Sequence, residues 1–102
     1  MSMPTQIVVF LNPADEEHAL YLIGESLTAT AWTIVDTQEE EVFWGDIFRL
    51  SRKEKRITLA LSAPVTPRQI EDIANLVTIG LILGFVVRGE IDLGERVINN
   101  LA

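Results

Sequence analysis

Three carboxylates and the chain's one histidine follow each other directly after an apolar segment, as Asp15, Glu16, Glu17 and His18. Paired carboxylates can carry out acid–base chemistry when an apolar pocket separates their pKa values, and α/β folds often bind ligands where a strand gives way to a helix. Acidic residues in a first helical turn are also what the positive end of a helix dipole favours. We therefore interpret these acids chiefly as a helix start, and keep Asn12, Asp15 and His18 as candidate ligand-binding residues.

The other side chains offer little to catalysis or metal binding. The chain has no cysteine, which excludes a thiolate zinc site, an iron–sulfur cluster and a cysteine nucleophile. The patterns Gly-x-Ser-x-Gly, Ser-x-x-Lys and His-Glu-x-x-His do not occur in the sequence. Consecutive acids such as 39–41 point in different directions and do not converge on a cation. We expect a non-enzymatic protein with no catalytic residue, no metal and no cofactor.

Charge is distributed unevenly along the chain. Residues 1–48 contain nine acids and no lysine or arginine, whereas residues 49–56 contain five of the eight basic residues. The net charge of −7 excludes a general nucleic-acid binder, because neutralising phosphates needs a basic face. We expect a basic hairpin tip on an acidic domain, either as a contact for another protein or as charge that keeps strand edges from pairing with other chains. The candidate partner-binding residues here are Arg49, Arg52, Lys53, Lys55, Arg56, Glu39, Glu40 and Glu41.

The two tryptophans are further candidates. Trp32 and Trp44 lie in segments that we expect to be neighbouring strands. A pair of indoles facing each other across a hairpin would stabilise the sheet, whereas indoles on an exposed sheet face would act as interface anchors. We keep both as candidate partner-binding residues.

Spacing predicts the elements that position these residues. Asn12 can cap a helix whose first position is Pro13, and Thr66, Pro67 and Gln69 form a capping box for a second helix. Runs of β-branched residues and two-residue alternation predict the strands. The expected elements are strands at 7–11, 28–37, 42–50 (with a bulge at Gly45) and 57–62, polar turns at 38–41 and 51–55, and a helix at 13–26.

Two features of the C-terminal third stay open. The second helix runs to about Leu83, or it ends near Gly80 and is followed by an edge strand at 83–88. The apolar residues of 76–87 exceed one helix face, which indicates either a homodimer seam or a helix buried on two sides. Asp92 can cap a short last helix.

The element order is therefore β-α-β-β-β-α, followed by the possible edge strand and the short C-terminal helix. Short turns make the middle strands an antiparallel meander, which the first strand joins through its helix crossover. This order predicts an α+β fold with an antiparallel-rich sheet, a two-layer sandwich of ferredoxin-like type, in one domain over 1–102. The apolar runs are too short for a secretory signal or a membrane span, so we expect a cytoplasmic protein.

These features favour a small acidic cytoplasmic protein with a protein-interaction or regulatory role, such as an adaptor, an inhibitor or an immunity-type protein. It would act through an acidic surface and an apolar patch, as a homodimer, on another protein with a basic surface and without direct nucleic-acid contact. The alternative is a sensor domain that binds a small ligand at the first strand–helix junction, where a helix N-terminus attracts anions.

Overall fold

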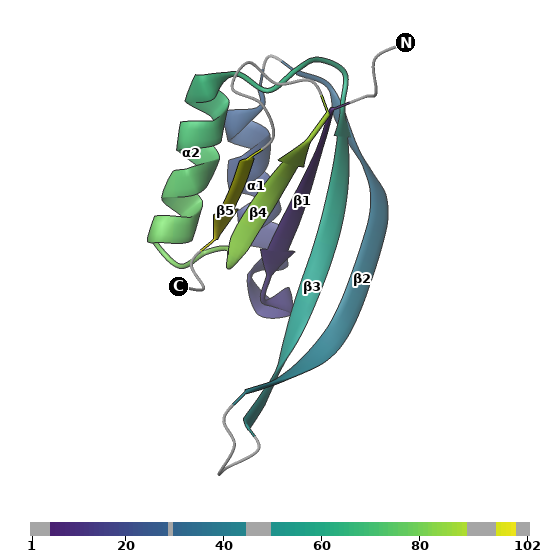
Figure 1. Cartoon of the computed structure of the whole chain (residues 1–102), viewed down its shortest axis with the longest axis vertical. Coiled ribbons are helices and arrows are strands. Elements are labelled where there is room, and N and C mark those ends of the chain that lie inside the picture. Colours follow the sequence, from purple (N-terminus) through teal and green to yellow (C-terminus); the bar gives the residue numbers. More distant parts are fainter. Residues whose placement is uncertain (1–4, 29, 45–49, 90–95, 100–102) are drawn as a thin grey trace.

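Five strands form one antiparallel sheet, and two helices pack against one of its faces (Figure 1). The computed structural model describes residues 5–28, 30–44, 50–89 and 96–99. The strands follow the order β2-β3-β1-β4-β5 across the sheet. In chain order the elements are β1 (Thr5–Leu11), the short 3-10 helix η1 (Pro13–Asp15), α1 (Glu16–Ser26), β2 (Trp32–Trp44), β3 (Leu50–Leu61), α2 (Pro67–Thr78), β4 (Gly84–Arg88) and β5 (Arg96–Asn99).

This arrangement is the ferredoxin-like α+β sandwich that the sequence predicts, with a fifth strand added at one edge. Strand β1 lies between β3 and β4 and is antiparallel to both, so the two strand–helix–strand units interleave. Alternate residues of the inner strands face the helices and form the core, because successive side chains of a strand point to opposite faces. The buried set includes Ile7, Val9 and Leu11 of β1, Ile57, Leu59 and Leu61 of β3, and Ile23, Ile70 and Ile73 of the helices.

The predicted start of the second helix is confirmed, whereas the helix predicted at 13–26 begins with the 3-10 helix η1 and α1 itself starts at Glu16. The side chain of Asn12 accepts a hydrogen bond from the backbone of Ala14 at 3.0 Å. The capping box of α2 is complete, with Thr66 and Gln69 each bonded to the other's backbone. These caps satisfy backbone N–H groups that have no partner inside the helix.

The middle of the chain differs from the prediction. The segments 38–41 and 51–55, expected as turns, belong to the long strands β2 and β3. Their residues pair across the sheet, with Glu39 opposite Lys55 and Glu41 opposite Lys53. Opposite charges facing each other stabilise a strand pair, and this long-range pairing outweighs the low strand propensity of glutamate and lysine.

The strand irregularity also lies elsewhere than expected. The register of β2 against β3 shifts between Ile34 and Asp36, so that Val35 is the extra residue of a β-bulge. The predicted bulge at Gly45 lies outside the described residues. The bulge changes which face of the sheet each following residue of β2 occupies.

The C-terminal third follows the shorter of the two helix predictions. Helix α2 ends at Thr78, Gly80 has a positive φ of 79°, and β4 follows where a strand at 83–88 was one of the two predictions. The strand is not at the edge of the sheet as predicted, because it lies between β1 and β5. The predicted last helix is wrong for the residues that the structure describes there, because 96–99 form β5, paired with β4. Pairing satisfies backbone groups along β4 that a helix at this position would leave open.

The apolar stretch 76–87 is divided between the core and the surface. Leu76 and Ile82 are buried in the core, whereas Ile79 is exposed just after the end of α2. Most of the stretch therefore packs within the chain, as the end of α2, a loop and β4 rather than as one helix buried on two sides. No helix in the described ranges is long and apolar enough to cross a membrane.

Two glycine-to-alanine substitutions should change stability in opposite directions. Gly24 lies inside α1, and a Cβ there would sit 3.4 Å from Cζ2 of Trp32, an ordinary contact distance. Gly24→Ala should therefore raise the free energy of unfolding by about 0.5–1 kcal/mol, as expected for removing a glycine from a helix. Gly80→Ala should lower it by about 1 kcal/mol, because its positive φ strains any residue with a Cβ.

Urea unfolding of the two variants beside the unchanged protein measures both effects. A loss of stability in Gly24→Ala would mean that the Trp32 ring cannot move to accommodate the added methyl group. It would contradict the expected increase in the free energy of unfolding.

Candidate functional site

The β2–β3 hairpin is longer than the sheet that supports it. The last residue of β1, Leu11, pairs with Lys55, and the neighbouring strand β4 starts beside Phe10. Beyond Lys55 the hairpin continues as a two-stranded ribbon, which we call the arm and define as residues 40–44 and 50–54. Figure 1 shows the arm extending past both helices, and the molecule measures 48 × 24 × 24 Å.

The arm and its base bring the predicted acidic and basic segments together. Glu39, Glu40 and Glu41 run along β2, directly beside Lys53 and Lys55 of β3. The two candidate surfaces are therefore one ribbon with an acidic strand and a largely basic strand, in which Glu54 is opposite Glu40. Arg52 pairs with Val42 on the same ribbon, and Arg49 lies outside the described residues.

Lys55 fastens the base of the arm to α1. It is on the same face of β3 as the buried Ile57, and its ammonium donates a 2.5 Å hydrogen bond to the Oε1 of Glu16. The two side chains are 21 % and 32 % exposed, so water screens this ion pair less than it would screen a pair on the open surface. Lys55 thus has a structural contact at the base of the arm.

Arg56 links three strands on the opposite face of the sheet. Its Nη2 donates to Oε1 of Gln38 at 2.9 Å, and a carboxylate oxygen of Glu40 lies 3.7 Å from it. Its Cζ sits 5.9 Å from the centre of the Phe10 ring, within the range of a cation–π contact. The Nε of Arg56 is buried with no hydrogen-bond partner among the described residues. Arg56 therefore holds β2, β3 and β1 together on this face.

The tryptophans do not face each other. Both lie on β2, where Trp32 pairs with Leu61 and Trp44 with Leu50. The prediction is wrong because the expected turn between them is strand. The Trp32 ring packs beside Gly24 and against the core, and for Trp44 the structure describes only the backbone.

The first strand–helix junction does not gather the three ligand-binding candidates. The Oδ1 of Asn12 is occupied by the cap of η1, and Asp15 precedes α1 as its N-cap without a side-chain capping bond. His18 is exposed and lines an open depression of about 450 Å³, together with Ala14 and Tyr21. In the described residues no three histidine, cysteine, aspartate or glutamate side chains are placed to hold a metal ion.

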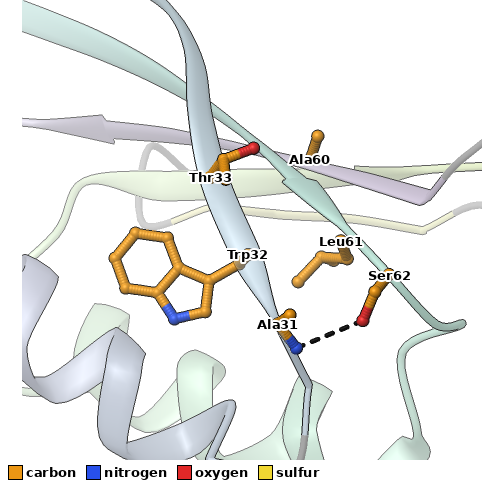
Figure 2. A pocket seen from close by; sticks show the side chains of 6 residues that line it. All are labelled: Ala31, Trp32, Thr33, Ala60, Leu61 and Ser62. Atoms are coloured by element: carbon orange, nitrogen blue, oxygen red, sulfur yellow. Dashed lines mark hydrogen bonds between the residues drawn. The ribbon is translucent and has the colours of Figure 1, made fainter.

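The structure adds a feature that the sequence analysis missed. A hollow of about 250 Å³ lies where β2 begins, and Figure 2 shows the Trp32 indole beside it and Ser62 accepting a hydrogen bond from the backbone of Ala31. That bond measures 3.1 Å. A second shallow depression of about 330 Å³ follows along the same strand at the bulge. The adjacent apolar pair Ile34 and Val35 breaks the two-residue alternation, and this is the signal that could have revealed the bulge.

No family model matches the chain, and no curated protein matches it. Among solved structures it is similar to B. subtilis GlnK, with 14 % identity, a TM-score of 0.40, and coverage of 84 % of this chain and 83 % of that one.

Arginine-to-lysine substitutions should separate the structural arginine from an exposed one. Arg56→Lys should lower the free energy of unfolding by about 1 kcal/mol, because a lysine cannot both stack on Phe10 and bond to Gln38. Arg68→Lys is the matched control, since Arg68 is 84 % exposed and lies 3.6 Å from Asp72 within one helix face. It should leave stability unchanged, because such surface pairs contribute little. Equal effects of the two substitutions in urea unfolding would contradict the role given to Arg56.

Proposed function

We propose that this chain is a small non-catalytic interaction protein, of the adaptor, inhibitor or immunity type, and that it contacts another protein through the arm. One observation carries the proposal, namely that the β2–β3 hairpin continues beyond Lys55 without a third strand. A two-stranded ribbon is only marginally stable by itself in water. A ribbon of this kind gains little stability from its own two strands. A binding partner would cover the surface that no third strand covers.

The charge of the arm supports a protein as the partner. The acidic strand carries Glu40 and Glu41, and the basic strand carries Arg52 and Lys53. Glu40, Glu41 and Lys53 are exposed, and charges of both signs on a narrow ribbon can orient a partner during encounter. The overall charge of −7 favours a partner whose surface is basic overall, attracted by the field of the whole molecule. The basic strand of the arm would face acidic residues of that partner, so that the contact is complementary on both strands.

A charge-reversal experiment tests this contact. Arg52→Glu/Lys53→Glu reverses two charges in the arm and avoids the structural residues Lys55 and Arg56. Arg68→Glu/Arg88→Glu is the control, because it changes the net charge equally at exposed positions on α2 and β4. Affinity capture from the organism's own lysate should recover a stoichiometric protein with the unchanged chain and the control. The arm variant should recover at least about tenfold less, as expected when several charge contacts become repulsive.

The melting temperatures of the three proteins are measured beside the capture experiment. All three proteins should melt alike, because the arm lies outside the core. The arm variant should also keep the strand signal in far-ultraviolet circular dichroism, which shows that the ribbon persists although Lys53 no longer faces Glu41 with opposite charge. Equal capture by the arm variant and the unchanged chain would contradict the proposal, and so would an equal loss in the control.

A ligand-sensing function is the second candidate. The depression beside His18 favours it, because this candidate residue lines a hollow of about 450 Å³, within the size range of small-molecule pockets. A ligand bound there would raise the melting temperature with increasing concentration, and His18→Ala would remove the increase. Cytoplasmic localisation and a homodimeric state stay predictions from the sequence.

A further inference from the structure

The outer edge of β2 is the longest strand edge on the described part of the protein. In the sheet order β2 has a neighbour on one side only, over thirteen residues. Alternate residues of an edge strand turn their N–H and C=O groups outward. Such an edge can accept a further strand, either from another protein or in aggregation.

The first half of this edge is apolar and hollowed. Ile34 and Val35 are 45 % and 53 % exposed, although both lie within a strand. The hollow of about 250 Å³ precedes them along the chain, lined by residues 31–33 at the start of β2 and by residues 60–62 at the end of β3 (Figure 2). Small-molecule pockets usually measure about 300–1,000 Å³, so this hollow fits one apolar side chain better than a metabolite.

The second half of the edge is acidic. Asp36, Glu39 and Glu40 are all exposed along it. A strand laid beside them would place its side chains about 5 Å from theirs on each face. Lysine or arginine at those positions would be attracted, whereas acidic residues would be repelled.

This charge pattern argues against the β2 strand of a second copy as the occupant. Two copies of β2 paired antiparallel around Gln38 would place Asp36 of one beside Glu40 of the other, and pairing around Thr37 would place Glu39 and Glu40 beside the apolar Val35 and Ile34. Like charges directly opposite each other destabilise a strand pair. A basic segment of a different protein avoids this repulsion.

We infer that β2 takes up an extended segment of the partner protein as an added strand, with an apolar residue of the segment at the Trp32 hollow and lysine or arginine residues beside Asp36, Glu39 and Glu40. The inference rests on the proposed function, since the segment belongs to the protein that the arm contacts. Backbone hydrogen bonds provide the affinity, while the hollow and the acids select the sequence.

A synthetic peptide provides the test. The probe has one half of alternating valine and threonine and one half of successive lysines, which places lysines both on the face of Asp36 and Glu40 and on the face of Glu39. It is made in both orders because the strand direction is open. Binding is followed by the emission of Trp32 in a Trp44→Phe background, which leaves one indole. We expect a saturable change for one of the two orders.

Backbone N-methylation distinguishes strand addition from charge attraction. A strand paired on one side uses only every second N–H group, so peptides methylated at alternate residues in the two possible phases form a matched pair. Methylation in the pairing phase should weaken binding at least about tenfold, because several hydrogen bonds are lost together. Methylation in the other phase should change it by less than about threefold. Equal effects in the two phases would overturn the added strand.

Protein variants test the charges in the same assay. Asp36→Asn/Glu39→Gln should weaken binding about tenfold, and the difference should shrink at high salt. Glu25→Gln/Glu71→Gln removes the same charge from exposed positions on the two helices and should bind as the unchanged protein does. Failure of both peptide orders to bind the folded protein would overturn the inference, as would self-association that competes with the peptide.

The peptide assay and the capture experiment can fail separately. Peptide binding that survives Arg52→Glu/Lys53→Glu, in a protein whose capture is unaffected by that change, would retain the β2 site and refute the arm contact. Loss of capture in the arm variant without any peptide binding would retain the arm contact and refute the added strand.

Discussion

The length of β1 determines how much of the β2–β3 hairpin is held in the sheet. β1 ends at Leu11, opposite Lys55, and from that row onward the hairpin has no third strand. On the side of the Leu11–Lys55 pair where β1 is present, alternate residues such as Ile57 are fully buried under the helices. On the other side, in the arm, the ribbon depends for its stability on its own cross-strand pairs. The division of the molecule into a packed body and a projecting arm follows from this one boundary.

Two neighbouring residues secure the boundary on opposite faces. Lys55 bonds to Glu16 at the start of α1, while Arg56 stacks on Phe10 and bonds to Gln38. Because successive strand residues alternate in direction, these two cations attach the base of the arm to the helical layer and to the open sheet face. The same glutamate–lysine pairing that keeps a polar sequence extended also places exposed charges along the arm. Lys55 and Arg56 thus have structural roles at the base of the arm, whereas Lys53, beyond the base, has the proposed functional role.

Local signals were sufficient for part of this structure. The strand at 7–11, the helix starts at Asn12 and Thr66 and the overall α+β order could be predicted, because capping and alternation act over a few residues. The strand state of 38–41 and 51–55 could not, since it depends on pairing between the two segments. For the same reason the sequence analysis wrongly predicted that Trp32 and Trp44 lie on different strands and that 96–99 belong to a helix. The charged candidates were found as residue types, but their grouping into one ribbon required the register.

Site-specific photo-crosslinking tests the central claim most directly. A photoreactive amino acid at position 53, on the arm, is compared with the same group at position 68, on the exposed face of α2, in intact cells of the source organism. The account predicts that one protein is crosslinked from position 53 and not from position 68. No crosslinked protein at position 53, or the same products from both positions, would contradict it.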